Sequence, residues 1–535
     1  MRVKEKLKRK CKSKHGITLV ALVITIVILI ILATVTVNVA FGDGGLIDQA
    51  KLAAEKTTNS IYDEEASIAN LTAYLNEQLG EGEIAPPEDT EPPEITSFTE
   101  TEVTANSITV SVAATDNSGG ALKYEYRKGS EAFTEGGTTY QFTGLTADTE
   151  YTLEVKVTDE AGLSDTATKK VTTALPTVPE EWDTTKVTPV FSKDKQWVPV
   201  PKGFTASEAE GENEVNKGFV IYQKTDPVND ENVLEEQKDR NQFVWIPVDE
   251  ESLNDMYEVK EATLSQSSHG EGATTTNVYS KQRWTTSGGV PGSTSFREPD
   301  ILPDTSSGDA STTSERGINL IKSVFGITGD NASILKQWAE MLVNEYEAVY
   351  ESVKKYNGFY IGRYELTGTT TSPTVQRNKA VLTASGSQAG NWYALKKACN
   401  DIVSTNEVQS IMIYGNMWDE TMQWLIDTGA KKEAEINEDS TSWGNYSDSS
   451  GNAAISGAGS KQNSGYSDCW SANNVYDLAG NYYDYTQEAN STNYRVRRGG
   501  LCGLSGSQDP ASKRDRNTPN GSNNQYSSRP ALYIK

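Results

Sequence analysis

The chain has 535 residues, and its 74 acidic and 49 basic side chains give a formal net charge of -25. A surface of that sign repels nucleic acid, so we expect no nucleic-acid partner. The only histidines are His15 and His269, which argues against a histidine-based zinc site or a Ser-His-Asp triad. The length is enough for about three domains of roughly 150 residues each.

The amino-terminal segment joins a basic leader to a long apolar run. Residues 1–16 read MRVKEKLKRKCKSKHG, and residues 17–41 carry no charge. A run of that length predicts a transmembrane helix, with the rest of the chain outside the cell. The junction resembles the leader of type IV prepilin-like proteins, which implies that a prepilin peptidase cleaves between Gly16 and Ile17. A plain single-pass anchor is the alternative, because Ala21 stands where true pilins usually carry a glutamate.

The next segments predict a stalk, a linker and a small β-domain. Helical spacing of apolar residues predicts a helical stalk within residues 42–80, and the Pro/Glu-rich residues 81–94 predict an extended linker. Over residues 95–174, the alternating runs ITVSV (108–112), KYEYR (123–127) and YTLEVKV (151–157) predict an antiparallel sandwich. The stretch GLTADTEYTLEVKVTD resembles a fibronectin type III repeat, which implies a tyrosine-corner role for Tyr151.

A second linker, residues 175–190, leads into residues 191–535. There the spacing predicts a helix over 334–355, and a Ser/Thr/Gly-rich stretch between Asp249 and Asp330 predicts inserted loops. The ordered blocks FVWIPV, YIGRYELT, WDETMQWL, NVYDLAGNYYDYT and RVRRGG resemble the formylglycine-generating enzyme and sulfatase-modifying-factor family. That family has a variant of the C-type lectin fold. We therefore expect a multidomain chain: a transmembrane or pilin-like α-helix, an all-β fibronectin III-like sandwich and an α+β C-type lectin-fold head.

The same resemblance implies a structural calcium ion. The family's acidic-Gly-Asn-acidic block reads DLAGNYYD here, and it implies side-chain ligands from Asp477 and Asp484 and carbonyl ligands from Gly480 and Tyr482. Carboxylate and carbonyl oxygens on a tight turn suit a hard cation. A glycine turn with solvated carboxylates is the alternative.

The family's oxidase chemistry is not expected in this chain. The formylglycine-generating enzymes need a pair of cysteines after the RGG block, whereas Cys502 is the last cysteine of this sequence. One thiolate cannot form a two-sulfur copper site. We therefore predict that the protein is not an enzyme. Cys502 is either an exposed variable residue or the disulfide partner of Cys469, and the sequence leaves both open.

The carboxyl-terminal residues 495–535 alternate framework-like blocks (RRGG, SGS, PAS and SSRPALYIK) with chemically unrelated side chains. On a lectin-like scaffold, this pattern resembles the variable proteins of diversity-generating retroelements, in which adenine-directed mutation rewrites surface codons. An AAC or AAT codon mutated at its first two positions cannot encode Gln508, Lys513 or Gln525, which depart from that scheme. The resemblance implies a variable ligand-binding face made of Leu501, Cys502, Gly503, Leu504, Asp509, Asp515, Arg516, Asn517, Thr518, Asn520, Gly521, Asn523, Asn524 and Tyr526.

These features predict cell-surface display of a ligand-binding domain whose face is diversified by a retroelement. The location would be single-pass membrane-anchored or pilus-associated, with extracellular carboxyl-terminal domains. The partner would be a protein or carbohydrate on another cell, a phage or a host surface. A pilin-like adhesin of fixed specificity and a degenerate oxidase of the formylglycine-generating type are the alternatives.

Overall fold

The computed structural model describes residues 89–224, 239–257, 315–385, 390–449, 455–491 and 494–535. The chain divides into two compact units. The smaller unit comprises residues 1–96, 114–124 and 156–166, and the larger unit comprises residues 97–113, 125–155 and 167–535. The leader, the cleavage site between Gly16 and Ile17, and the predicted stalk (42–80) lie outside the described residues.

The expected localisation is corrected. No helix in the described ranges combines the length and the apolar character needed to cross a membrane. Residues 17–41, on which the expectation of a membrane-anchored cell-surface protein rested, lie outside those ranges. That localisation is therefore not retained.

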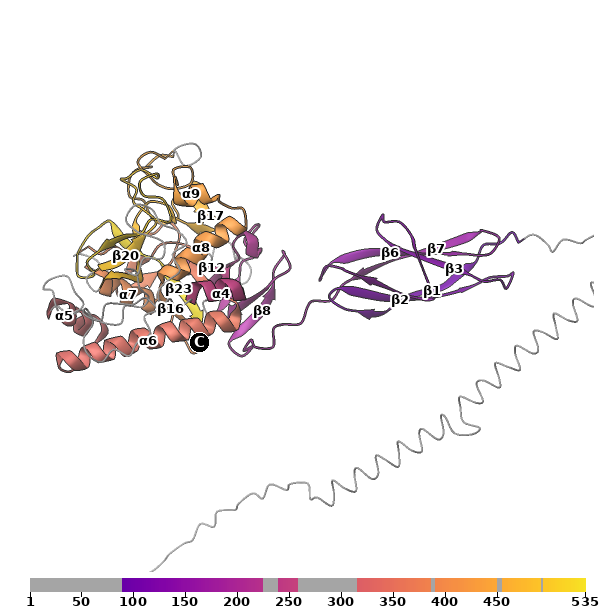
Figure 1. Cartoon of the computed structure of the whole chain (residues 1–535), viewed down its shortest axis with the longest axis horizontal. Helices are drawn as coiled ribbons and strands as arrows, with labels where there is room; N and C mark the ends of the chain where they lie inside the picture. Colours follow the sequence, from indigo (N-terminus) through magenta and orange to yellow (C-terminus); the bar gives the residue numbers. More distant parts are fainter. Residues whose placement is uncertain (1–88, 225–238, 258–314, 386–389, 450–454, 492–493) are drawn as a thin grey trace, which may run out of the picture. The chain divides into compact units, whose positions relative to one another are not determined.

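Seven strands over residues 94–172 form a β-sandwich (Figure 1). The two sheets have the strand orders β1-β2-β5 and β4-β3-β6-β7. The strands are β1 (Glu94–Val103), β2 (Ser107–Thr115), β3 (Lys123–Lys128), β4 (Thr134–Gly136), β5 (Thr139–Thr143), β6 (Glu150–Thr158) and β7 (Ser164–Thr172). Alternate residues are buried, as at Leu153, Val155 and Val157, because successive side chains of a strand point to opposite faces. The predicted sandwich is confirmed.

Tyr151 occupies the geometry expected of a tyrosine corner. Its hydroxyl oxygen accepts a hydrogen bond from the Thr146 amide at 2.8 Å. This bond ties the start of β6 to the backbone a few residues upstream, as the fibronectin III resemblance implies.

The carboxyl-terminal domain is built on a six-stranded antiparallel sheet with the order β10-β11-β12-β13-β23-β16. Its strands are β10 (Phe204–Ala206), β11 (Val220–Gln223), β12 (Gln242–Pro247), β13 (Gly358–Gly362), β16 (Val408–Met412) and β23 (Pro530–Ile534). The last strand of the chain, β23, therefore lies inside this sheet, between β13 and β16. Leu532 and Ile534 pack into one hydrophobic cluster, and Ala531 and Tyr533 pack into a second one. Both faces of the sheet are thus buried.

The domain also contains helices (Figure 1). They are α4 (Glu250–Tyr257), α5 (Glu315–Phe325), α6 (Asn331–Tyr356), α7 (Trp392–Asp401), α8 (Gly415–Asp427) and α9 (Glu433–Asn437). Of these, α6, α7 and α8 pack against strands of this sheet. The long helix α6 confirms the helix predicted over 334–355. It begins at a side-chain cap, where the carboxylate of Asp330 accepts from the Ser333 amide at 2.8 Å. Within the stretch predicted as loops, α4 and α5 are helical, while residues 258–314 lie outside the described ranges.

A second sheet carries some of the residues expected to be functional: Asp484, Asp515, Arg516, Asn517 and Tyr526. Its order is β21-β20-β19-β22, with β19 (Tyr483–Ser491), β20 (Tyr494–Arg498), β21 (Asp515–Asn517) and β22 (Tyr526–Ser528). Short pairs complete the domain: β8 (Val187–Phe191) with β9 (Trp197–Pro201), β14 (Thr367–Thr369) with β15 (Ser372–Thr374), and β17 (Ser471–Ala472) with β18 (Val475–Tyr476). Two 3₁₀ turns lie at Val215–Lys217 and Asp468–Trp470.

Candidate functional site

Arg498 and Arg514 of the carboxyl-terminal stretch are fully buried. Arg498 contacts Asp419 at 2.6 Å and Glu488 at 3.3 Å, and both side chains of the Arg498–Glu488 pair are fully buried. Arg514 binds Glu488 at 2.9 Å and also pairs with Asp419. Burial raises the pKa of Asp419, and the two guanidinium groups oppose that shift. Two cations and two carboxylates thus balance in the interior, where an unpaired charge would be strongly destabilising.

Arg529 also pairs with a buried carboxylate, in this case that of Asp484 in the predicted calcium block. Its Nε donates to the carboxylate of Asp484 at 3.2 Å, and its terminal nitrogens donate to the carbonyl oxygens of Gly362 at 3.0 Å and Tyr476 at 2.8 Å. Asp477 uses one oxygen to accept from the Ser464 hydroxyl at 3.0 Å and from the Gly465 amide at 2.7 Å. The two carboxylates are therefore held by protein donors.

The backbone amides of Gly480 and Tyr482, two of the implied calcium ligands, bind acceptors within the protein. Gly480 has a φ of +77°, and its amide donates to the Gly499 carbonyl at 2.6 Å. The Tyr482 amide donates to Glu365 at 3.2 Å. The positive charge beside Asp484 is Arg529. Asp477, Gly480 and Asp484 are buried, Tyr482 is half-buried, and a calcium ion held by these four residues stays a prediction of the resemblance.

Burial raises the pKa values of the carboxyl groups in the turn from Asp477 to Asp484 and so favours their protonated forms. It raises the pKa of Asp477 to about 6 and that of Asp484 to about 7, with Arg529 opposing both shifts. Burial also raises the pKa of Glu365 well above its ordinary value, and the neighbouring carboxylates add to that shift. One oxygen each of Asp477 and Asp484 is buried without a hydrogen-bond partner. A proton or a cation can neutralise such oxygens.

The residues predicted to form the variable face divide into two groups. The side chains of the first group lie in the interior: Leu501, Cys502, Asp509, Asn520 and Tyr526. The second group is exposed or half-buried: Gly503, Leu504, Asp515, Arg516, Asn517, Thr518, Gly521, Asn523 and Asn524. Leu501, Cys502 and Tyr526 belong to a hydrophobic core cluster, so packing restrains them.

The structure brings much of the second group together on β21 and the turn that follows it. Asp515 pairs with Arg497, whose guanidinium lies 4.0 Å from the ring centre of Tyr483 and 4.3 Å from that of Tyr526. The Asn517 amide donates to the Tyr526 hydroxyl at 2.7 Å. Because the sequence predicts a ligand-binding role for them, we call Asp515, Arg516, Asn517, Thr518, Gly521, Asn523 and Asn524 the binding face. Leu504 is 38% exposed and contacts another segment, where its carbonyl oxygen accepts from the Ser447 amide at 2.9 Å.

An open depression adjoins the binding face at Asn524. Its volume is about 470 Å³, and its lining includes Lys461, Tyr466 and Tyr482. The ammonium of Lys461 donates to the Asn524 side chain at 2.8 Å. The depression therefore offers amide, hydroxyl and ammonium groups beside aromatic rings, a combination suited to orienting a polar ligand.

The structure agrees with neither of the two alternatives that the sequence left open for Cys502. Cys399, Cys469 and Cys502 are all free thiols, and Cys502 is buried while Cys469 is exposed. Burial raises the pKa of Cys502 to about 11. Cys502 is therefore neither an exposed variable residue nor a disulfide partner of Cys469, and its thiol is poorly suited to act as a thiolate nucleophile.

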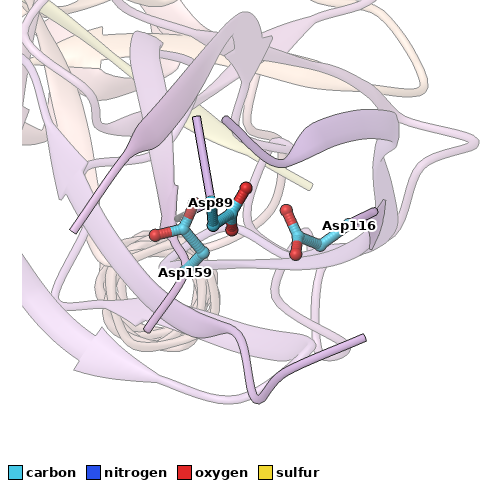
Figure 2. A group of neighbouring side chains, drawn as sticks. All are labelled: Asp89, Asp116 and Asp159. Atoms are coloured by element: carbon cyan, nitrogen blue, oxygen red, sulfur yellow. The ribbon is translucent and has the colours of Figure 1, made fainter. Parts of the chain in front are cut away.

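Sequence reasoning missed the partners of the framework arginines. Arg514 stands among the variable-looking residues, and its partners Asp419 and Glu488 lie on α8 and β19. It also missed Asp89, Asp116 and Asp159, whose carboxylate oxygens converge at one end of the sandwich (Figure 2). The available signal was two aspartates, each directly after a period-two strand and before a glycine-containing turn.

Comparisons with known proteins give no family for the chain. No family model matches, and no curated protein matches. Among solved structures, the PKD1 domain of Vibrio anguillarum Epp is 20% identical, with a TM-score of 0.15, covering 16% of this chain and 100% of its own. A human fibronectin type III domain is 14% identical, with a TM-score of 0.14, covering 18% and 94%. Carbohydrate-binding modules of the β-sandwich superfamily give 16% identity and a TM-score of 0.17, covering 30% and 56%.

Proposed function

We propose that the carboxyl-terminal domain is a ligand-binding module with a C-type lectin fold of the formylglycine-generating type, whose binding face is diversified by a retroelement. The observation that carries this proposal is the division of residues 495–535 by burial. Arg498, Arg514 and Arg529 are fully buried in ion pairs, whereas the binding face between them is exposed or half-buried. Substitution at the face therefore leaves the ion pairs of Arg498, Arg514 and Arg529 intact, and at Asp515 it removes the partner of Arg497.

The topology supports a lectin-like scaffold. The last strand, β23, pairs with both β13 and β16 inside the large sheet, so the carboxyl terminus is fixed by hydrogen bonds on both sides. The small sheet presents β21 as an edge strand and follows it with a turn. An exchangeable segment held between two fixed points can change its side chains without changing its path.

A few residues of the face would supply most of the affinity for any one ligand. Amides on the face offer hydrogen bonds, Arg516 offers a charge and planar stacking, and the adjoining depression offers Tyr466 and Tyr482. Specificity is a difference of affinities, so exchanging one or two of these anchors can change the preferred ligand. We propose a protein or carbohydrate ligand, because the chain's net charge of -25 opposes nucleic acid.

The diversification proposal is tested in the coding DNA. It predicts a near-copy of the segment that encodes residues 495–535 beside the gene, differing only where the copy has adenine, together with a gene for a reverse transcriptase. A locus with neither feature would leave a binding module of fixed specificity.

The oxidase alternative is tested with the purified full chain and a cysteine-containing peptide. We expect no copper-dependent conversion of the peptide cysteine, because Cys502 is one buried thiol with a raised pKa. Stoichiometric conversion to an aldehyde would make the protein an enzyme and would overturn the binding-module proposal.

A further inference from the structure

Three aspartates meet at one end of the sandwich. Asp89 precedes β1, Asp116 directly follows β2, and Asp159 directly follows β6. One carboxylate oxygen of each lies within 4.8 Å of the other two. Figure 2 shows the three carboxylates around a common space. All three belong to the smaller compact unit, so the site lies within one unit of the chain.

Local hydrogen bonds hold each carboxylate and leave oxygens free to bind. Asp159 accepts from the Leu163 amide at 2.8 Å with one oxygen, and Asp116 accepts from the Ser118 amide at 2.9 Å with one oxygen. Asp89 accepts from the Glu91 amide at 3.3 Å. These bonds orient the side chains in advance of any ligand, which lowers the entropy cost of binding.

The deepest of the three side chains carries an unsatisfied oxygen. Asp159 is only 7% exposed, and its second oxygen is buried without a hydrogen-bond partner. The second oxygen of Asp116 is likewise buried and unpartnered. A buried carboxylate oxygen without a donor is costly unless a cation or a proton neutralises it. The free oxygens are therefore an observation that points to a ligand, in addition to the acidic cluster itself.

We propose that Asp89, Asp116 and Asp159 bind a calcium ion through their carboxylate oxygens. The ligand atoms are oxygens from three separate segments, and such an irregular, all-oxygen set suits calcium better than zinc or a strictly octahedral magnesium ion. Calcium takes about six to eight oxygens, so backbone carbonyls and water would complete its shell. The ion fixes Asp89, near the end of the predicted linker 81–94, to the ends of β2 and β6.

Calcium binding is tested on the full chain after removal of metal with EDTA. Titration with calcium chloride in a calorimeter should show a saturable site, and calcium should raise the temperature at which the sandwich unfolds. Asp159→Asn keeps the shape of the side chain and removes its charge, so we expect it to weaken calcium binding at least about tenfold. Asp116→Asn should do the same. Glu131→Gln makes the same charge change at an exposed residue of the sandwich, 3.6 Å from Lys128, and should bind calcium like the unmodified chain.

The metal-free state separates a calcium site from a merely structural cluster. In EDTA, Asp159→Asn should unfold at the same temperature as the unmodified chain or at a higher one, because three carboxylates repel one another when no ion lies between them. In the presence of calcium, Asp159→Asn should unfold at a lower temperature than the unmodified chain. A lower unfolding temperature for Asp159→Asn in EDTA, without any response of the unmodified chain to calcium, would overturn the proposal.

A second control distinguishes this site from the block at Asp477 and Asp484. All ten tryptophans lie at residue 182 or later, so tryptophan fluorescence reports on the carboxyl-terminal domain and not on the sandwich. Calcium should shift the calorimetric transition of the sandwich and leave the fluorescence transition in place. If Asp484→Asn abolished calcium binding while Asp159→Asn retained it, the ion would belong to the carboxyl-terminal domain and the proposal would be wrong.

Discussion

At the residue scale, two arginines eighteen positions apart show how burial separates framework from face. Arg498 is fully buried against Asp419 and Glu488, whereas Arg516 is exposed on β21, with its guanidinium 5.1 Å from the ring centre of Tyr494. Both are long cationic side chains in the same stretch of sequence. The charge of Arg498 balances buried carboxylates, whereas the charge of Arg516 is screened by solvent.

This difference predicts that replacing arginine by methionine lowers the free energy of unfolding more at residue 498 than at residue 516. Arg498→Met should lower the free energy of unfolding by about 3–5 kcal/mol, because it removes one of the two guanidinium groups that pair with the buried carboxylates of Asp419 and Glu488. Arg516→Met should change it by less than about 1 kcal/mol. Urea unfolding monitored by tryptophan fluorescence measures both. Equal losses in the two variants would contradict the assignment of Arg498 to the framework.

The acidic turn predicts a pH dependence of stability. The pKa of Asp477 is raised to about 6 in the folded domain, above the ordinary value, so the folded state binds more protons than the unfolded state. Its contribution to stability is therefore present at low pH and is lost as the pH rises from about 4 to 6. Asp484 extends this window to about 7.

Asp477→Asn should flatten that dependence. The difference in unfolding free energy between the variant and the unmodified domain should shift in favour of the variant by roughly 2–3 kcal/mol between pH 4 and pH 7. Unfolding curves at a series of pH values measure the shift, with Asp427→Asn, at the end of α8, as the charge-matched control. Parallel curves for Asp477→Asn and the unmodified domain would refute the raised pKa.

At the element scale, two glycines in the turn after β20 have opposite requirements. Gly500 has a φ of +80°, and a Cβ there would collide with the Asp509 carbonyl oxygen. A Cβ on Gly503 would meet no atom within 4 Å. The first glycine therefore fixes the path of the chain, and the second tolerates a side chain.

Alanine at each glycine tests this distinction. Gly500→Ala should lower the free energy of unfolding by more than about 2 kcal/mol, because the residue would be strained and would displace Asp509. Gly503→Ala should change it by less than about 1 kcal/mol or stabilise the domain slightly. Thermal unfolding of the two variants decides between these outcomes, and comparable melting temperatures would contradict the opposite requirements of the two glycines.

The sequence predicted elements better than it predicted contacts. The period-two runs at 108–112, 123–127 and 151–157 lie inside β2, β3 and β6, because the alternation of apolar residues is set by the strand itself. The buried network of Arg498, Asp419 and Glu488 joins residues far apart in sequence, which no local pattern records. The same limit explains Leu501, Cys502 and Tyr526, whose irregular chemistry suggested surface residues and whose packing places them in the core.

At the scale of the whole molecule, the two proposed sites lie in different domains. The sandwich carries a converging set of three aspartates, and the carboxyl-terminal domain carries the binding face. The buried ion pairs of Arg498, Arg514 and Arg529 use side chains outside the binding face. A ligand-binding role for the face and a metal-binding role for the sandwich are therefore independent proposals, and the failure of one leaves the other standing.

The most direct test of a diversified binding face is deep sequencing of the DNA that encodes residues 495–535 across a population of the host organism. We predict substitutions concentrated in the codons of the binding face, from Asp515 to Asn524, and unchanged codons for Arg498, Gly500, Arg514 and Arg529. Sequences without variation, or with substitutions spread equally over framework and face codons, would contradict a diversified binding face on a fixed scaffold.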